Sequence, residues 1–110
     1  MVKFTVITCT FNAQSVIART LTSVLEQSYP HVEHLIIDGN SRDATLQLAN
    51  DYAEESAREV ASHEVVIVSE PDKGLYDAMN KGVARASGEW VIFMNAGDCF
   101  AATDVLQRIF

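Results

Sequence analysis

The chain has 110 residues, of which 48% are hydrophobic and 21% charged, as in a single folded globular domain and unlike a disordered or fibrous protein. Its formal net charge of -7 would repel a phosphate backbone, so we expect no nucleic-acid partner. No apolar run approaches the roughly 20 residues that span a bilayer, and residues 1–7 lack the signature of a signal peptide, so we expect a cytoplasmic protein.

The first quarter of the chain has the pattern of a buried strand followed by an amphipathic helix. Residues 4–8 are apolar and β-branched, which predicts a strand buried on both faces. Apolar residues recur at helical spacing over 16–25, with Ser15 placed to cap the helix and the Tyr29–Pro30 step to end it.

The middle of the chain repeats this alternation. Residues 34–38 predict a second buried strand, and the turn over 39–43 is rich in side chains that cap helices. A helix with an apolar face over 46–53 follows, and then a third strand over 65–68.

The last third predicts two more helices and one strand. Apolar spacing indicates a helix over 75–86 despite its internal Gly82, and residues 90–94 predict the fourth strand. Thr103 is placed to cap a final helix over 104–110.

This alternation predicts an α/β domain over residues 1–110, with a mostly parallel sheet sandwiched by helices. Ligands of such sheets bind outside the carboxyl ends of the strands. The loops that meet there cover residues 9–14, 38–43, 69–74 and 95–102.

Three common α/β classes do not fit the loop after the first strand. Residues 9–14 contain no glycine, whereas a dinucleotide-binding turn needs glycines to approach the pyrophosphate, and no P-loop is present. A phospho-acceptor receiver domain would carry acidic residues where this chain has Thr8 and Cys9.

The cysteines and histidines do not have the spacing of metal ligands. We interpret Cys9 and Cys99 as free thiols, although a bridge could form if the first and fourth strands are neighbours. We interpret His31, His34 and His63 as structural or solvated.

Two carboxylates, Asp38 and Asp98, each follow a predicted buried strand. Asp38 precedes Gly-Asn-Ser and fits either a turn or a site. Asp98 closes the segment that begins at Asn95, and hard divalent cations favour carboxylate and amide oxygens, so a metal site and a loop cap both fit.

The helix over 75–86 adds weaker candidates. Asp77 and Asn80 share one helix face, where Asp77 fits either a favourable charge in the first turn or a contact with a ligand. We interpret Lys73 as a solvated loop charge and expect Tyr76 to pack rather than stack on a base.

The chain resembles the family 2 glycosyltransferases of GT-A fold over nearly its whole length. The segments that carry the resemblance are residues 5–12, 21–29, 33–45, 70–82 and 86–98. Their order and spacing are specific together, and the segment from Asp72 to Asn80 resembles bacterial enzymes of polysaccharide assembly.

The resemblance implies transfer of a sugar from a nucleotide-diphospho-sugar, commonly a UDP-sugar, to a glycan or lipid-linked glycan with inversion. It also implies Mg²⁺ or Mn²⁺ bridging the diphosphate, which would neutralise the charge that develops on the leaving group. For the nucleotide donor, the resemblance and the helix candidates above together give Thr10, Asn12, Asp38, Asp77, Asn80 and Asn95. For the metal, the resemblance gives Asp98.

Two features depart from the family pattern. The usual cluster of acidic residues is reduced to Asp98, which predicts weaker metal binding. The catalytic base is expected beyond residue 110, so we interpret the chain as a donor-binding half, inactive alone, whose exposed apolar surface favours a homodimer. The full-length protein would then act at the inner face of the membrane.

Other function classes stay open. A non-catalytic module that binds a nucleotide or nucleotide-sugar would also explain the reduced acidic motif. A nucleotidyltransferase-like domain is a weaker alternative, because it would need a basic phosphate-binding loop near the first strand.

Overall fold

The computed structural model describes residues 2–59 and 63–109 of the chain. Strands and helices alternate along the sequence, as predicted. The strands are β1 (Phe4–Thr10), β2 (Val32–Asp38), β3 (Glu64–Ser69) and β4 (Trp90–Phe93). The helices are α1 (Ile17–Leu25), α2 (Thr45–Arg58), α3 (Leu75–Arg85) and α4 (Val105–Ile109).

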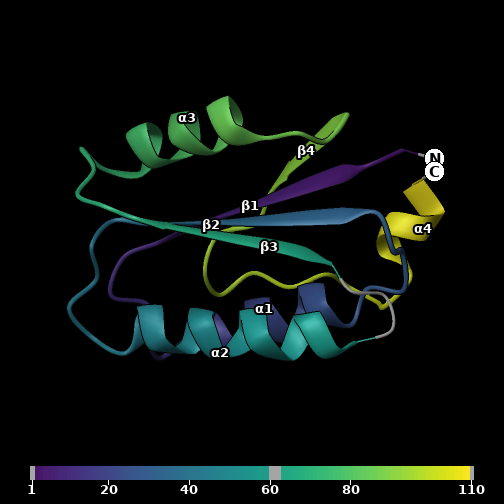
Figure 1. The fold of residues 1–110 in the computed structure, drawn as a ribbon, viewed down its shortest axis with the longest axis horizontal. Helices are drawn as coiled ribbons and strands as arrows, with labels where there is room; N and C mark the ends of the chain where they lie inside the picture. The colour runs from purple at the N-terminus through teal and green to yellow at the C-terminus, as the bar shows by residue number, and fades with distance from the viewer. Residues whose placement is uncertain (1, 60–62, 110) are drawn as a thin grey trace.

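The four strands form one parallel sheet in the order β3-β2-β1-β4. Helices α1 and α2 lie on one face of the sheet and α3 lies on the other (Figure 1). Every residue of β1 and β2 is buried, because both strands are central and covered on both faces. This confirms the predicted α/β fold with helices on both sides of the sheet.

Separate apolar layers form on the two faces of the sheet. Beneath α1 and α2 the buried residues are Ala13, Ile17, Leu21, Ile36, Ala49 and Tyr52. Beneath α3 they are Ile7, Cys9, Leu35, Ile37 and Ala78. The sheet is therefore a rigid support for the loops that leave its carboxyl ends.

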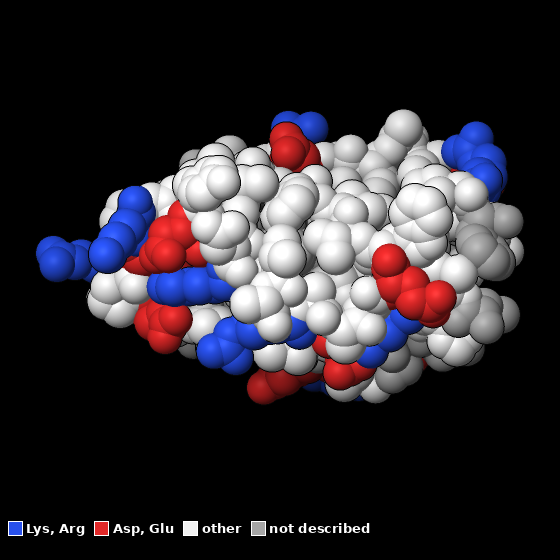
Figure 2. Space-filling view, turned by 90° about the horizontal axis from the view of Figure 1, so that it is seen from above, with Lys and Arg blue, Asp and Glu red and all other residues white. Residues whose placement is uncertain are grey.

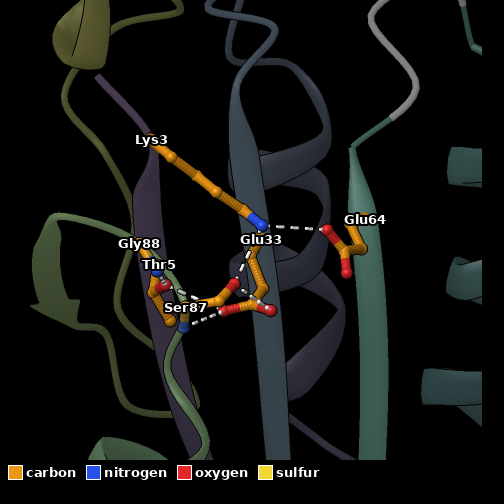
Figure 3. Close-up of polar contacts among 6 residues, drawn as sticks. All are labelled: Lys3, Thr5, Glu33, Glu64, Ser87 and Gly88. Atoms are coloured by element: carbon orange, nitrogen blue, oxygen red, sulfur yellow. Dashed lines mark hydrogen bonds and ion pairs between the residues drawn. The ribbon is translucent and has the colours of Figure 1, made fainter. Parts of the chain in front are cut away.

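At the amino ends of the strands, a buried carboxylate joins three segments (Figure 3). Glu33 of β2, only 4% exposed, accepts hydrogen bonds from Thr5 Oγ1 of β1 at 2.9 Å and from the Ser87 amide and hydroxyl at 2.9 and 2.8 Å. Lys3 Nζ lies beside this group, 3.1 Å from Glu64 and 2.8 Å from Ser87 Oγ. Burial raises the pKa of Glu33, but the bonds from Ser87 and Thr5 and the Lys3 charge outweigh it and leave the pKa lowered.

The predicted cap of α1 was wrong. The helix begins at Ile17, and the amides of Val16 and Ile17 donate to the Ala13 carbonyl at 3.0 and 2.9 Å, so a backbone turn starts the helix in place of Ser15. Helix α1 also ends at Leu25, before the Tyr29–Pro30 step.

The cap predicted at Thr103 is replaced by a residue distant in sequence. Gln27 Oε1 accepts from the Leu106 amide of α4 at 3.1 Å, while Gln27 Nε2 donates to the Ala102 carbonyl at 2.6 Å. Helix α4 is thus held against the segment that follows α1. Phe110, the last residue of the predicted helix, lies outside the described residues.

Seen from the side of α3, the surface carries few charged side chains in its middle, whereas basic and acidic groups lie at its ends and along its edges (Figure 2). Strand β4 forms an edge of the sheet, and its Trp90, Val91 and Phe93 are exposed. Among the described residues, none of the helices combines the length and apolar character that crossing a membrane requires.

Candidate functional site at the carboxyl ends of the strands

The loops that follow β1, β2 and β3 surround a pocket of about 380 Å³. They lie together at the left of Figure 1, beside the start of α3. The lining residues are Cys9, Thr10, Phe11, Gly39, Asp72, Gly74 and Leu75. Parallel strands bring these segments, which are distant in sequence, to one edge of the sheet.

Asp38 anchors the wall behind this pocket. Its carboxylate is 1% exposed and accepts four hydrogen bonds. Oδ1 accepts from Thr10 Oγ1 at 2.8 Å and Ser41 Oγ at 2.5 Å, and Oδ2 accepts from the Ser41 amide and Ser69 Oγ at 2.9 Å each. The three strand ends β1, β2 and β3 are therefore tied together through one side chain.

The pKa of Asp38 reflects the same network. Burial raises it, but the hydrogen bonds from Ser41, Thr10 and Ser69 favour the ionised form more strongly, so the pKa lies below its ordinary value. A carboxylate offers about four lone-pair positions, and all four are occupied here. The contact with the nucleotide donor predicted for Asp38 would require one of these bonds to open.

Asn12 shapes the loop after β1. Its backbone has a φ of 48°, its amide donates to Ser41 Oγ at 2.8 Å, and its Oδ1 accepts from the Arg42 amide at 2.8 Å. Asn tolerates this left-handed conformation better than most residues. Asn12 thus fixes the loops after β1 and β2 against each other, next to the pocket.

Asp72 is a pocket residue that sequence reasoning did not select. It lies in the turn before α3, where its Oδ1 accepts from the Gly74 amide at 3.0 Å, and Gly74 has a φ of 109° that favours glycine. Its Oδ2 faces Gly39, at which an added β-carbon would lie only 2.7 Å away. The sequence signal that could have identified Asp72 is the pair of glycines in these loops. Gly39 marks a close approach to Asp72, and Gly74 marks an unusual turn.

The predicted site residues Asp77 and Asn80 both lie on α3. Asp77 Oδ2 accepts from the Lys73 amide at 3.0 Å and pairs with Lys81 at 3.6 Å, contacts that a charge in the first turn of the helix would make. These contacts lower the pKa of Asp77. Contact of Asp77 with the donor stays a prediction. Asn80 is exposed on the same helix. Tyr76 is 80% exposed, so the prediction that it packs was wrong.

Asn95 and Asp98 form a tight turn after β4. The Asn95 amide donates to Asp98 Oδ2 at 3.2 Å, and the Asp98 amide donates to the Asn95 carbonyl at 2.9 Å. Asn95 Oδ1 is buried and has no hydrogen-bond partner among the described residues. Within that part of the chain, no three His, Cys, Asp or Glu side chains come together as a metal-binding group.

The cysteines and His34 take part in no metal-binding group among the described residues. Cys9 and Cys99 are free thiols, as predicted, and burial together with the nearby Asp72 raises the pKa of Cys9 to about 11. His34 is fully buried between Thr8 Oγ1 and the Tyr52 hydroxyl, each 2.7 Å from a ring nitrogen. Burial and the nearby His63 lower the pKa of His34, so neither Cys9 nor His34 is ionised at neutral pH.

A second, larger hollow of about 500 Å³ lies between α1 and residues 99–103. Its lining residue Cys99 follows Asp98 in the sequence, and Arg19 Nε donates a hydrogen bond to Cys99 Sγ at 3.3 Å. Of the predicted site residues, only Thr10 lines the first pocket, and none lines this second hollow. Among the predicted site residues, Thr10 is thus hydrogen-bonded to Asp38 and Asn95 to Asp98, whereas Asp77 and Asn80 lie on α3.

A parallel sheet with its polar groups at the carboxyl ends defines an α/β protein built to hold a ligand at that edge. The sequence pattern of glycosyl transferase family 2 matches residues 5–110, and the chain belongs to this family. A PGL/p-HBAD biosynthesis glycosyltransferase of Mycobacterium bovis is 35% identical over 106 residues, which are 96% of this chain and 40% of the relative.

Solved structures agree with this assignment. The mannosyltransferase PcManGT from Pyrobaculum calidifontis, in complex with GDP-Man and Mn²⁺, has a TM-score of 0.84 and 29% identity over 96% of this chain and 30% of its own. S. aureus TarS in complex with UDP-GlcNAc has a TM-score of 0.78 and 28% identity over 97% of this chain and 30% of its own. The fold is thus that of the GT-A glycosyltransferases, and the chain spans less than half the length of these relatives.

Proposed function

We propose that this protein transfers a sugar from a nucleotide-diphospho-sugar, with a UDP-sugar as donor. The observation that carries the proposal is the pocket at the carboxyl ends of the strands, in a chain that belongs to glycosyl transferase family 2. Its volume of about 380 Å³ lies within the range of small-molecule sites. The complexes of TarS with UDP-GlcNAc and of PcManGT with GDP-Man support a donor of this class.

In this proposal the nucleotide lies over the ends of β1 and β2. Thr10 lines the pocket directly, and Asn12 holds the adjoining loop in place. Asn95 would meet the donor from the turn after β4. Asp77 and Asn80 would contact it only from α3, where Asp77 is already engaged with Lys73 and Lys81.

The turn from Asn95 to Asp98 fits a divalent cation. Mg²⁺ is commonly held by one or two carboxylates together with substrate phosphates, so Asp98 and the unpartnered Asn95 Oδ1 provide a suitable set of hard oxygen donors. We propose that Asp98 holds Mg²⁺ or Mn²⁺, in line with the Mn²⁺ in PcManGT. When bound, the cation would neutralise the charge on the leaving diphosphate.

The acceptor half of the reaction is proposed to depend on residues beyond 110. Inversion at the sugar carbon needs a base that deprotonates the acceptor hydroxyl. We infer that this base and the site for a glycan or lipid-linked glycan lie in that part, at the cytoplasmic side of the membrane.

A non-catalytic nucleotide-binding module is the second candidate. It is favoured by the reduced acidic motif, in which Asp98 is the single carboxylate of the turn. The two candidates differ in outcome, because an enzyme would release UDP from a UDP-sugar, whereas a module would bind UDP and leave the UDP-sugar intact.

The test measures the thermal midpoint with UDP, GDP and CMP, with and without Mn²⁺, followed by UDP release from UDP-sugars by the protein at its natural length. A ligand at a hundredfold its dissociation constant stabilises by about 2.7 kcal/mol, a shift on the order of ten degrees. Asp98→Ala should abolish the part of the shift that requires Mn²⁺. Asp104→Ala, which removes only an exposed ion pair with Arg108, should retain it. A folded sample that no nucleotide stabilises would contradict the proposal.

A further inference from the structure

A buried hydroxyl of α1 is bonded to the turn that follows β4. Thr20 is fully buried, and its Oγ1 accepts a hydrogen bond from the Gly97 amide at 2.7 Å. The same hydroxyl donates to the Asn95 carbonyl at 3.5 Å. Thr20 therefore contacts two peptide groups that lie between Asn95 and Asp98, the residues proposed to hold the cation.

The turn contains a glycine in a conformation that other residues avoid. Gly97 has a φ of 101° at the third position of the turn, where a positive φ favours glycine. A β-carbon added there would lie 3.7 Å from Val16 Cβ, an ordinary contact, so the backbone conformation and not crowding requires the glycine. Glycine also has the greatest backbone freedom, so the turn depends on its contacts to stay in one conformation. The bond from Thr20 is made at this glycine.

Helix α1 is a firm support for this contact. Thr20 belongs to the buried face of α1, together with Ile17 and Val24. Three residues after Thr20, Ser23 Oγ accepts from the Phe100 amide at 2.6 Å. These two hydroxyls share one side of the helix because residues three apart lie above one another. The turn and the chain that leaves it are thus fastened to α1 at two successive points.

The oxygens that would bind the cation come from the two ends of this turn. Asn95 Oδ1 is buried and has no hydrogen-bond partner within the described part of the chain, whereas Asp98 is exposed. Mg²⁺ requires near-octahedral geometry, and a turn with a single carboxylate has few ligands with which to meet it. Affinity then depends on how well the two oxygens are held in place before the cation arrives.

We propose that Thr20 is a positioning residue for the divalent cation, because its hydroxyl fixes the turn that places Asn95 Oδ1 and Asp98 relative to each other. The inference rests on the metal site proposed above. Thr20 itself does not touch the cation. Without its hydroxyl, the Gly97 amide would lose its acceptor in a buried place, and the turn would leave this conformation to find another partner.

The experiment measures the dissociation constant of UDP by calorimetry, with saturating Mn²⁺ and without divalent cations. The ratio of the two constants is the gain that Mn²⁺ gives to nucleotide binding. Thr20→Val keeps the size and branching of the side chain but removes the hydroxyl, and we expect it to lower this gain at least fivefold. The affinity for metal-free UDP should stay within twofold, because Thr20 does not line the pocket at the ends of β1, β2 and β3.

A conservative variant and a matched control complete the design. Thr20→Ser restores the hydroxyl and should keep at least half of the gain. Thr5→Val removes an equally buried hydroxyl at the opposite ends of the strands, one that accepts from the Gly88 amide at 2.8 Å and donates to Glu33 at 2.9 Å. It should leave the gain within twofold. Thermal midpoints verify that each variant is folded, and Thr20→Ala takes the place of Thr20→Val if the valine variant is not.

The outcomes separate the two proposals. If Asp98→Ala abolishes the gain while a folded variant without the Thr20 hydroxyl retains it, the role of Thr20 is wrong and the metal site stands. If Thr5→Val lowers the gain equally, or Thr20→Ser does not restore it, the loss reflects general loosening and the inference is wrong. If UDP binds equally well with and without Mn²⁺, the metal site fails and the inference with it. If UDP does not bind at all, the proposed function fails as well.

Discussion

Gly82 of α3 and Ile7 of β1 lie so close together that a β-carbon added at Gly82 would be 2.6 Å from Ile7 Cγ2. The backbone of the helix therefore rests directly on a side chain of the central strand. This contact sets the distance between α3 and the sheet, and it explains why a glycine interrupts an otherwise favourable helical sequence.

The first prediction concerns this contact. In an exposed helix Gly→Ala would stabilise by up to about 1 kcal/mol, but overpacking a core costs about 1–3 kcal/mol. We expect Gly82→Ala to lower the free energy of unfolding by about 1–2 kcal/mol in urea denaturation. Asn80→Ala on the exposed side of the same helix should be neutral or stabilising. Equal stabilisation by both alanines would show that α3 does not rest on Ile7.

The second prediction concerns Asp38. Asp38→Asn leaves one acceptor oxygen for four donors, so we expect a loss of about 2–3 kcal/mol in the free energy of unfolding. The matched control is Asp51→Asn, since Asp51 is an exposed residue of α2 that accepts a bond from Gln47. Guanidinium denaturation of both variants gives the comparison. A loss of under 0.5 kcal/mol for Asp38→Asn would mean that the four bonds contribute little.

The third prediction concerns pH and His34. Burial, and the nearby His63, lower the pKa of His34 to about 3, whereas the unfolded chain has an ordinary value of about 6.5. Below pH 6.5 the unfolded chain therefore takes up a proton that the folded protein does not, so stability falls as pH falls. From pH 7 to pH 5 this contribution costs about 2 kcal/mol.

Urea midpoints between pH 7 and pH 5 provide the measurement. His34→Gln should reduce the slope of stability against pH, whatever its effect on stability at pH 7. The pKa of His63 is also lowered, mainly by burial, so part of the slope should remain. An unchanged slope in His34→Gln would contradict the buried neutral imidazole.

The fourth prediction separates the two ends of the sheet. Glu33 holds the amino ends of the strands through Thr5 and Ser87, far along the strands from the pocket (Figure 3). We expect Glu33→Gln to lower the free energy of unfolding by about 1–2 kcal/mol. The UDP affinity of the folded variant, measured by calorimetry, should stay within twofold. A large loss of affinity with intact folding would place Glu33 in the ligand site.

The sequence predicted the elements well because their signals are local. Apolar β-branched runs gave the four strands to within two residues at each end, and the spacing of apolar residues gave α3 from Leu75 almost to its end. The alternation of strands and helices then predicted a parallel sheet, and that topology alone led to the expectation of a ligand site at the carboxyl ends.

The caps and the polar roles were decided by the tertiary structure. Gln27 replaced Thr103 as the partner of α4 although it lies 79 residues from Leu106, and no local pattern encodes such a pairing. Asp38 was found among candidates for ligand contact, but only the fold shows that Thr10, Ser41 and Ser69 occupy its oxygens.

Asp72 gives the reverse case. In the sequence it is one acid in a polar turn, and only the packing of that turn over Gly39 brings its carboxylate to the pocket. The sequence by itself determined the parallel sheet and its covering helices, and it predicted the edge at which a ligand would bind, because hydrophobic periodicity acts over a few residues. The tertiary structure decided which polar atoms remain free at that edge, because hydrogen-bond partners are set by contacts between segments distant in the chain.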